Sequence, residues 1–403
     1  MIVACTKIYS FVSTEGITER DNKTKMLSEL LDGLDSSLRI QILSPELLPL
    51  AFDMIRANIF RPFHFIQKPT SSSGTLYEVE DEETLLESSW PHLMLVYQIF
   101  FQMIIFPQFD ASIAAKYMDS VFINQFIWLF QSQDAREREM LKNMLHRIYG
   151  KFVCLRPLIT KSVKNSLIEF VYENEEECNG VSELLEVFES IVSGFKVPLK
   201  PENAEFLCNY LIPLHKSKAL PNFHQQLSKC MAKYIQKDSK CAIQIYNGIL
   251  KYWPITNSIK EVNFLNEVEE LVEACKDSSL FHIEKELFKK LCKCICSSNL
   301  QVAEKSLLML NNEKIIDILS RNRAILYPKL VGSLMENSES HWSNYISTLT
   351  LNSIKVLMEL DSKLFETSSR KYQQEKADKT KKRAAIDNKW KALENNFKST
   401  LLI

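Results

Sequence analysis

Residues 134–152, DAREREMLKNMLHRIYGKF, hold the pattern that decides the fold. Asp134 is a residue type that caps the start of a helix, and Glu137 follows three positions later, as in a capping box. Apolar side chains then recur at spacings of three and four residues: Leu141, Met144, Leu145, Ile148 and Phe152. This spacing predicts an amphipathic helix over 134–151 with one buried stripe.

The same periodicity runs outward in both directions from this helix. Four helices are predicted before it, at 23–34, 45–60, 91–106 and 111–131. After it, helices are predicted at 157–172, 181–194, 202–216, 221–236, 238–252, 258–275, 282–297, 299–309, 311–320, 322–336 and 341–360. No sustained Val/Ile/Thr alternation indicates a sheet. Glycine is also scarce, at 8 of 403 residues, which disfavours doubly wound sheets and phosphate-binding loops.

Closely spaced helix pairs of roughly 40 residues are typical of solenoids. We therefore predict an all-α, HEAT- or armadillo-like α-solenoid, a superhelix of antiparallel helix pairs; an irregular helical bundle is the alternative. A single solenoid is expected over 1–360. Residues 61–84 are expected to form a long loop, because they combine two prolines, a Ser-Ser-Ser-Gly run and an acidic cluster. Residues 361–403 are expected to form a charged C-terminal helix or tail.

Charge and hydropathy set limits on the function. The 49 basic and 50 acidic residues give a net charge of −1, so the chain has no global field for nucleic acid or an anionic membrane. The most apolar stretch, 93–106, is shorter than the roughly 20 residues that a bilayer requires. We expect no transmembrane segment and a cytoplasmic or nuclear location.

The ten cysteines are expected to be reduced and mostly buried as small hydrophobes. Cys292, Cys294 and Cys296 form a C-x-C-x-C run, but side chains two residues apart on a helix point away from each other. No metal site and no cofactor are therefore predicted. The sequence also contains no Walker loop, G-x-G-x-x-G, G-x-S-x-G or H-E-x-x-H motif. These absences favour a non-enzymatic protein that binds other proteins.

One stretch is a candidate binding surface: LHRIYGKFVCLR at 145–156. His146, Arg147, Tyr149 and Lys151 alternate with the buried stripe and are expected to point largely away from it. Arg156 follows at the turn. Tyrosine offers apolar contact area, and arginine grips carboxylate or phosphate through paired hydrogen bonds. From spacing alone, an ordinary basic helix surface remains the other reading.

At these residues the sequence resembles the B-prime regulatory subunits of protein phosphatase 2A. The LHRIYGKF…LR block is similar to the best-known block of that family. Further blocks match in the same order: SWPHLMLVY at 89–97, NGVSELLEVFESIVSGF at 179–195, LIPLHKSKAL at 211–220, LKYWP at 250–254, KEVNFLNEVEE at 260–270, QVAEKSLLMLNNE at 301–313 and HW at 341–342. Several blocks in order are far more specific than one motif.

The resemblance implies a pseudo-HEAT superhelix that joins the scaffold and catalytic subunits of the phosphatase. It also implies recruitment of short acidic or phosphorylated peptides of the Leu-x-x-Ile-x-Glu type. Carried over by position, the peptide groove would contain His146, Arg147, Tyr149, Arg156, Glu186, Val187, Ile191 and Lys200. The peptide's aliphatic anchors would meet Tyr149, Val187 and Ile191. Its negative charges would meet Arg147, Arg156 and Lys200.

The chain departs from the family pattern at a few places. The family usually has Thr at Asn143, Ile at Val187 and His at Asn203, and the acidic loop 175–178 is one residue longer here. A missing histidine would weaken capture of the peptide glutamate. Extra acid beside the groove would repel acidic peptides.

Two other functions are compatible with a helical repeat. One is a scaffold or transport adaptor for other protein cargo, although the five tryptophans form no regular ladder. The other is nucleic-acid binding through the basic residues of 361–398. A solvated helix that packs on the last repeat also explains that basic tail, and no nucleic-acid partner is expected.

Overall fold

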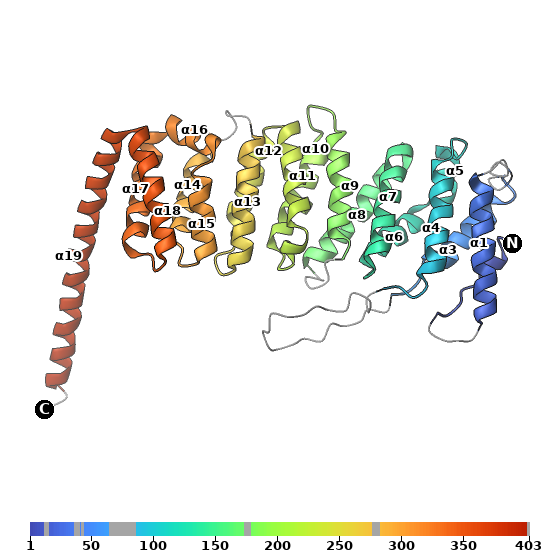
Figure 1. Ribbon diagram of the computed structural model, residues 1–403, viewed down its shortest axis with the longest axis horizontal. Coiled ribbons are helices and arrows are strands. Elements are labelled where there is room, and N and C mark those ends of the chain that lie inside the picture. The colour runs from blue at the N-terminus through green and yellow to red at the C-terminus, as the bar shows by residue number, and fades with distance from the viewer. Residues whose placement is uncertain are drawn as a thin grey trace. The chain divides into compact units, whose positions relative to one another are not determined.

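The computed structural model describes residues 1–11, 16–35, 41, 44–63, 86–172, 179–275 and 283–400 (Figure 1). The chain forms two compact units, Met1–Cys230 and Met231–Ile403. Within the described residues every regular element is helical, and none is a strand. The predicted all-α fold of stacked helices is therefore confirmed.

The first unit begins with a short 3-10 turn and continues with α-helices. Its elements are a 3-10 turn (Ala4–Thr6), α1 (Ile17–Asp35), α3 (Leu48–Ile59), α4 (Trp90–Ile105), α5 (Ala111–Tyr117), α6 (Ser120–Trp128), a 3-10 turn (Leu129–Gln131), α7 (Ala135–Lys151), a 3-10 turn (Val153–Leu155), α8 (Arg156–Tyr172), α9 (Val181–Ser193) and α10 (Pro201–Phe206). A π-helical turn (Leu207–Leu211) and two 3-10 turns (Ile212–Lys216 and Leu220–Asn222) follow.

Helix α11 (His224–Lys237) spans the boundary between the units. The second unit continues with α12 (Cys241–Lys251), α13 (Ser258–Ala274), α14 (Glu284–Ile295), α15 (Leu300–Met309), α16 (Glu313–Arg321), α17 (Arg323–Ser340), α18 (Asn344–Leu360) and α19 (Ser362–Thr400). Within the described residues no helix is long and apolar enough to cross a membrane.

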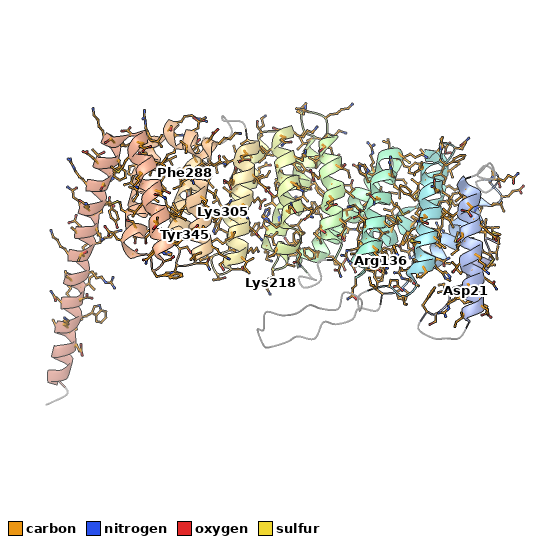
Figure 2. All side chains as sticks on the ribbon, in the orientation of Figure 1. Asp21, Arg136, Lys218, Phe288, Lys305 and Tyr345 are labelled. Carbon is orange, nitrogen blue, oxygen red and sulfur yellow. The ribbon has the colours of Figure 1, made fainter. Side chains whose placement is uncertain are left out.

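Each unit is built from two rows of helices. In the first unit, α4, α7 and α9 pack in one row, and α6 packs on α8. In the second unit, α13, α15 and α18 form one row and α14, α17 and α19 the other. Polar contacts tie the α13–α15–α18 row together. Lys305 of α15 lies 2.5 Å from Glu269 of α13, and Tyr345 of α18 donates to Glu304 of α15 at 2.6 Å (Figure 2).

The core follows the predicted stripe of α7. All five apolar residues of that stripe are fully buried: Leu141, Met144, Leu145, Ile148 and Phe152. Beside it, Phe52, Phe100 and Phe122 make edge-to-face contacts with ring centroids 5.7 to 6.2 Å apart. Such aromatic pairs add attraction beyond the area that they bury.

Two long predicted helices are broken, and each break has a local cause. The 111–131 segment splits into α5 and α6, because Met118 leaves helical geometry and Asp119 caps a new helix by accepting from Phe122 N. The 202–216 segment is α-helical only to Phe206. It continues as the π and 3-10 turns before and around Pro213, a residue that cannot donate a helical hydrogen bond.

Of the two residues of the capping box expected at 134–137, Asp134 has the predicted role and Glu137 does not. Asp134 caps α7 by accepting from Arg136 N at 2.9 Å. Glu137, however, is fully buried and accepts from Tyr97 and from both terminal nitrogens of Arg61. A buried carboxylate requires such partners, so Glu137 joins α7 to α4 and to residue 61 instead of capping its own helix.

The predicted division into a solenoid over 1–360 and a tail over 361–403 stays a prediction. Most of the expected 61–84 loop lies outside the described residues, as does the acidic 175–178 insertion.

Candidate functional site

Helices α7 and α9 lie side by side, although their facing residues are 44 positions apart in the sequence. Lys142 Nζ lies 2.7 Å from Glu186 Oε2, and His146 Nε2 lies 3.0 Å from Ser190 Oγ. Each pair is one helical turn from the other on both helices, so α7 and α9 run in the same direction. This pairing brings the LHRIYGKF block (145–152) and the ELLE block (183–186) onto one surface, which we call the α7–α9 surface.

An open hollow lies between α4 and α7 at the edge of this surface. Its lining residues are Gln98, Phe101, Met140, Asn143, His146 and Arg147. Both His146 and Arg147 are exposed, as the sequence predicted. Arg147 therefore presents its guanidinium to the surface, where it could pair with an anion.

Tyr149 and Arg156 form one local cluster at the end of α7. The Arg156 guanidinium lies 5.1 Å from the centroid of the Tyr149 ring, within the range of a cation–π contact. Its Nε donates to Tyr149 O at 2.9 Å, and its Nη2 donates to Gly150 O at 3.3 Å. Cations favour the carbonyl end of a helix, so Arg156 holds the last turn of α7 while both side chains stay half-buried.

Lys151, expected on the solvent face of α7, has a structural role. Its ammonium group donates to Ile104 O at 2.6 Å and to Phe106 O at 2.5 Å. It therefore satisfies free carbonyls where α4 ends. Partial burial lowers the pKa of Lys151, and Asp110 offsets part of that effect.

The two aliphatic residues assigned to the site from α9 are buried. Val187 is 2% exposed and Ile191 is 8% exposed. Both belong to the apolar face on which α9 packs. In this conformation Val187 and Ile191 expose little surface to a ligand. The half-buried Tyr149, which lies between Arg147 and Arg156 in the sequence, exposes more.

Lys200 lies at the start of α10, which aromatic contacts hold against α9 and α8. Phe206 stacks on Phe188 of α9 with centroids 4.7 Å apart. Lys164 of α8 lies 5.1 Å from the ring centroid of Tyr210, in the π-helical turn after α10. Lys200 itself is exposed. Its grouping with Arg147 and the rest of the predicted groove rests on sequence position.

The carboxylate of Glu186 is held by neighbours from two helices. Partial burial works to raise its pKa, but hydrogen bonds from Lys142 and Gln226 outweigh burial and keep the pKa below its ordinary value. The same pairing raises the pKa of Lys142, against the effect of its own burial. Both groups are therefore charged near neutral pH, and each offsets the other.

Sequence reasoning missed Lys142 and Ser190, which join α7 to α9. Lys142 lies one turn before His146, and Ser190 lies one turn after Glu186. That i, i+4 spacing places each of the two residues on the same side of its helix as a residue already assigned to the site, and the sequence shows it. Which helix faced α7 was not apparent, because helix pairing is a tertiary property.

No arrangement in the described residues suits a metal. No group of three or more His, Cys, Asp or Glu side chains converges there. In the C-x-C-x-C run, Cys294 contacts Glu261 and the exposed Cys296 contacts Ser333 O. Cys294 and Cys296 therefore point to different neighbours, as their spacing of two residues predicts, whereas Cys292 and Cys296, one helical turn apart, both contact Ser333.

The stacked rows of helices place this protein in the class of α-helical repeat proteins. The family is then unambiguous. Residues 1–397 match the model of the protein phosphatase 2A regulatory B subunit (B56 family). The chain belongs to this family, which confirms the resemblance seen in the sequence.

Relatives across plants, animals and fungi support the assignment. The chain is 39% identical over 397 residues to the B' eta isoform of the 59 kDa phosphatase 2A regulatory subunit from Arabidopsis thaliana, covering 97% of this chain and 76% of the relative. It is 39% identical over 391 residues to the alpha isoform of the 56 kDa regulatory subunit from Mus musculus, with 97% and 79% coverage. It is 38% identical over 383 residues to the delta 1 isoform from Schizosaccharomyces pombe, with 95% and 69% coverage. The chain is thus a regulatory and non-catalytic protein, as predicted.

Proposed function

We propose that this chain is the substrate-targeting subunit of a protein phosphatase 2A holoenzyme. It binds the scaffold and catalytic subunits and performs no chemistry itself. Membership of the family of regulatory B subunits supports this assembly. A tethered substrate experiences a higher effective concentration at the catalytic subunit, which raises its rate of dephosphorylation without any new catalytic group.

The substrate site in this proposal is the α7–α9 surface, occupied by an extended Leu-x-x-Ile-x-Glu segment. The observation that carries it is the pairing of Lys142 with Glu186 and of His146 with Ser190, which joins two sequence-distant blocks and leaves Arg147 exposed beside them. Extended peptides bind through side-chain pockets and charge pairing. The surface has cations for the acidic positions and the Tyr149 ring for an apolar one.

Each part of the peptide has a proposed contact. Arg147 and Lys200 meet carboxylate or phosphate groups, since both side chains are exposed. Arg156 keeps Tyr149 in place through the ring contact and the hydrogen bond to its carbonyl. Because Val187 and Ile191 are buried, the aliphatic anchors rest mainly on Tyr149.

Assembly is tested by reconstitution. The purified chain is mixed with phosphatase scaffold and catalytic subunits and analysed by size-exclusion chromatography. We expect one ternary complex. Separate elution at micromolar concentrations would remove the holoenzyme part of the proposal.

The peptide site is tested separately by calorimetry with a synthetic Leu-x-x-Ile-x-Glu peptide. Arg147→Glu should weaken binding by at least about tenfold, because it replaces a cation with a group that repels the peptide. Lys355→Glu is the matched control, since it makes the same charge change at an exposed position of α18. Equal affinities of the two variants would place the peptide elsewhere.

A further inference from the structure

Helix α19 contains the basic segment that the proposed function leaves unexplained. Its first turns are anchored to the rest of the second unit. Phe365 and Ser368 are buried, and Tyr372 lies against Gly332 of α17. Lys376 forms an ion pair with Glu339 at the end of α17. Beyond this contact, α19 extends past α17 and α18 (Figure 1).

The face of α19 that packs on α17 continues into the extended part. Ile386, Trp390 and Leu393 follow Tyr372 by 14, 18 and 21 positions. At about 100° per residue these positions fall within about 60° of Tyr372 around the helix axis. The three side chains are nevertheless 54%, 67% and 59% exposed. The helix thus presents a two-turn apolar stripe in line with an existing helix–helix interface.

Cations outnumber acidic residues around this stripe, although Asp387 and Glu394 lie on the same side of the helix as Trp390. Residues 377–394 contain six Lys or Arg and three Asp or Glu, a net charge of +3. Lys379 and Arg383 precede Ile386 by seven and three positions, so they extend the same face toward Tyr372. In the part of the helix that the structure describes, the six cations are exposed and have no ion-pair partner: Lys379, Lys381, Lys382, Arg383, Lys389 and Lys391.

We propose that residues 379–393 of α19 bind an amphipathic helix of a partner protein, whose apolar stripe carries Asp or Glu beside it. A helix fits because the same face already packs against the helix α17. Acidic flanks fit because Lys379 and Arg383 lie beside the apolar residues and lack partners. Exposed apolar side chains in line with a packed interface mark such docking surfaces.

Charge argues against the other occupants. A second copy of this chain would bring the same +3 segment against itself, and like charges in contact are unfavourable. A membrane-surface helix concentrates its cations opposite its apolar side. Here Lys379 and Arg383 lie on the apolar side, and only Lys381 lies opposite Trp390. The electrostatics therefore match an acidic helix better than a bilayer or a copy of the chain.

The test uses the full chain and a fluorescent synthetic peptide of four heptads with Leu at positions a and d and Glu at e and g. Glu at those positions keeps the probe from pairing with itself. Fluorescence anisotropy should show saturable binding. Trp390→Ala should weaken binding of the peptide by about tenfold, since a tryptophan that becomes buried on binding contributes much of the affinity of a small interface. The Lys379→Glu/Arg383→Glu double variant should also weaken it by about tenfold or more.

Lys381→Glu is the matched control, because it changes a charge on the opposite side of the same helix; its affinity should stay within about threefold of the parent. Circular dichroism confirms that each variant keeps its helix content. The proposal is overturned if the acidic probe does not bind, or if Trp390→Ala has no effect. It is equally overturned if a probe with Lys at e and g, a phosphatidylserine vesicle or duplex DNA binds more tightly than the acidic probe.

Discussion

Lys142 of α7 and Glu186 of α9 form an ion pair with 2.7 Å between Nζ and Oε2. This contact fixes the two helices that carry the proposed peptide site. It also neutralises a carboxylate on a surface that is proposed to bind acidic ligands. Lys142 also reaches a second carboxylate, Glu139, at 2.7 Å, so one positive charge is shared between two negative ones.

Replacing Lys142 by Met should weaken peptide binding without unfolding the protein. The variant leaves Glu139 and Glu186 uncompensated beside the ligand, and repulsion should lower affinity by about three- to tenfold at low salt. Calorimetry at two salt concentrations measures this, and the loss should shrink in high salt. Lys142→Arg, which keeps the charge, should bind like the parent. A salt-independent loss would mean that Lys142 acts through packing alone.

Removing Arg61 should strongly destabilise the first unit. Its guanidinium makes two 2.8 Å hydrogen bonds to Glu137, whose side chain is fully buried. Loss of one partner from a buried pair costs about 3–5 kcal/mol, because the other charge stays buried without compensation. Urea denaturation of Arg61→Met measures the cost. Arg370→Met is the control: its ion pair with Glu366 is exposed, so the change should be under about 1 kcal/mol. Similar losses in the two variants would contradict this account.

Two glycines of the candidate site region should respond in opposite ways to alanine. Gly180 is the N-cap residue of α9 and has φ +78°, and an added Cβ would overlap the carbonyl oxygen of Phe130. Strain and overlap should make Gly180→Ala destabilising by about 2–4 kcal/mol. Gly150 lies inside helix α7 with nothing within 4 Å of an added Cβ. Gly150→Ala should therefore stabilise by about 0.5–1 kcal/mol. Thermal unfolding midpoints that move in the same direction would refute the comparison.

Lys23 should make stability depend on pH in the alkaline range. Its side chain is 1% exposed and donates to Asn58 Oδ1 at 2.6 Å and Lys7 O at 2.7 Å. Burial lowers the pKa of Lys23 to about 8 from its ordinary value of 10.5. Between these two values the unfolded chain binds a proton that the folded chain lacks. The Lys23 contribution to stability therefore rises with pH across this window and is least favourable below pH 8.

The comparison of wild type with Lys23→Met measures this contribution together with the interaction between Lys23 and Cys5, because the other groups that titrate in this range are present in both chains. Denaturation between pH 7.5 and 9.5 should show the stability of wild type gaining on that of the variant as pH rises. A constant difference between the two proteins would mean that the Lys23 pKa is the same in the folded and unfolded states.

The positions of most helices could be predicted from the sequence, because burial of one face imposes a period of 3.6 on each segment. The stripe from Leu141 to Phe152 predicted α7, and the Asn179-Gly180 break predicted the start of α9. The errors fell where a local competitor outweighed periodicity. Asp119 starts a new helix inside an apolar stretch, and the segment around Pro213 leaves α-helical geometry.

The sequence by itself determined the all-α class, the family and the exposed side of α7, since each of these depends on local spacing or on ordered blocks of residues. Only the tertiary structure decided that α9 is the neighbour of α7, that Glu137 pairs with Arg61 rather than capping its helix, and that Val187 and Ile191 are buried. A helical period reveals which side of a helix faces the interior. It carries no information about which distant residue will meet that side, because this depends on the packing of all the helices together.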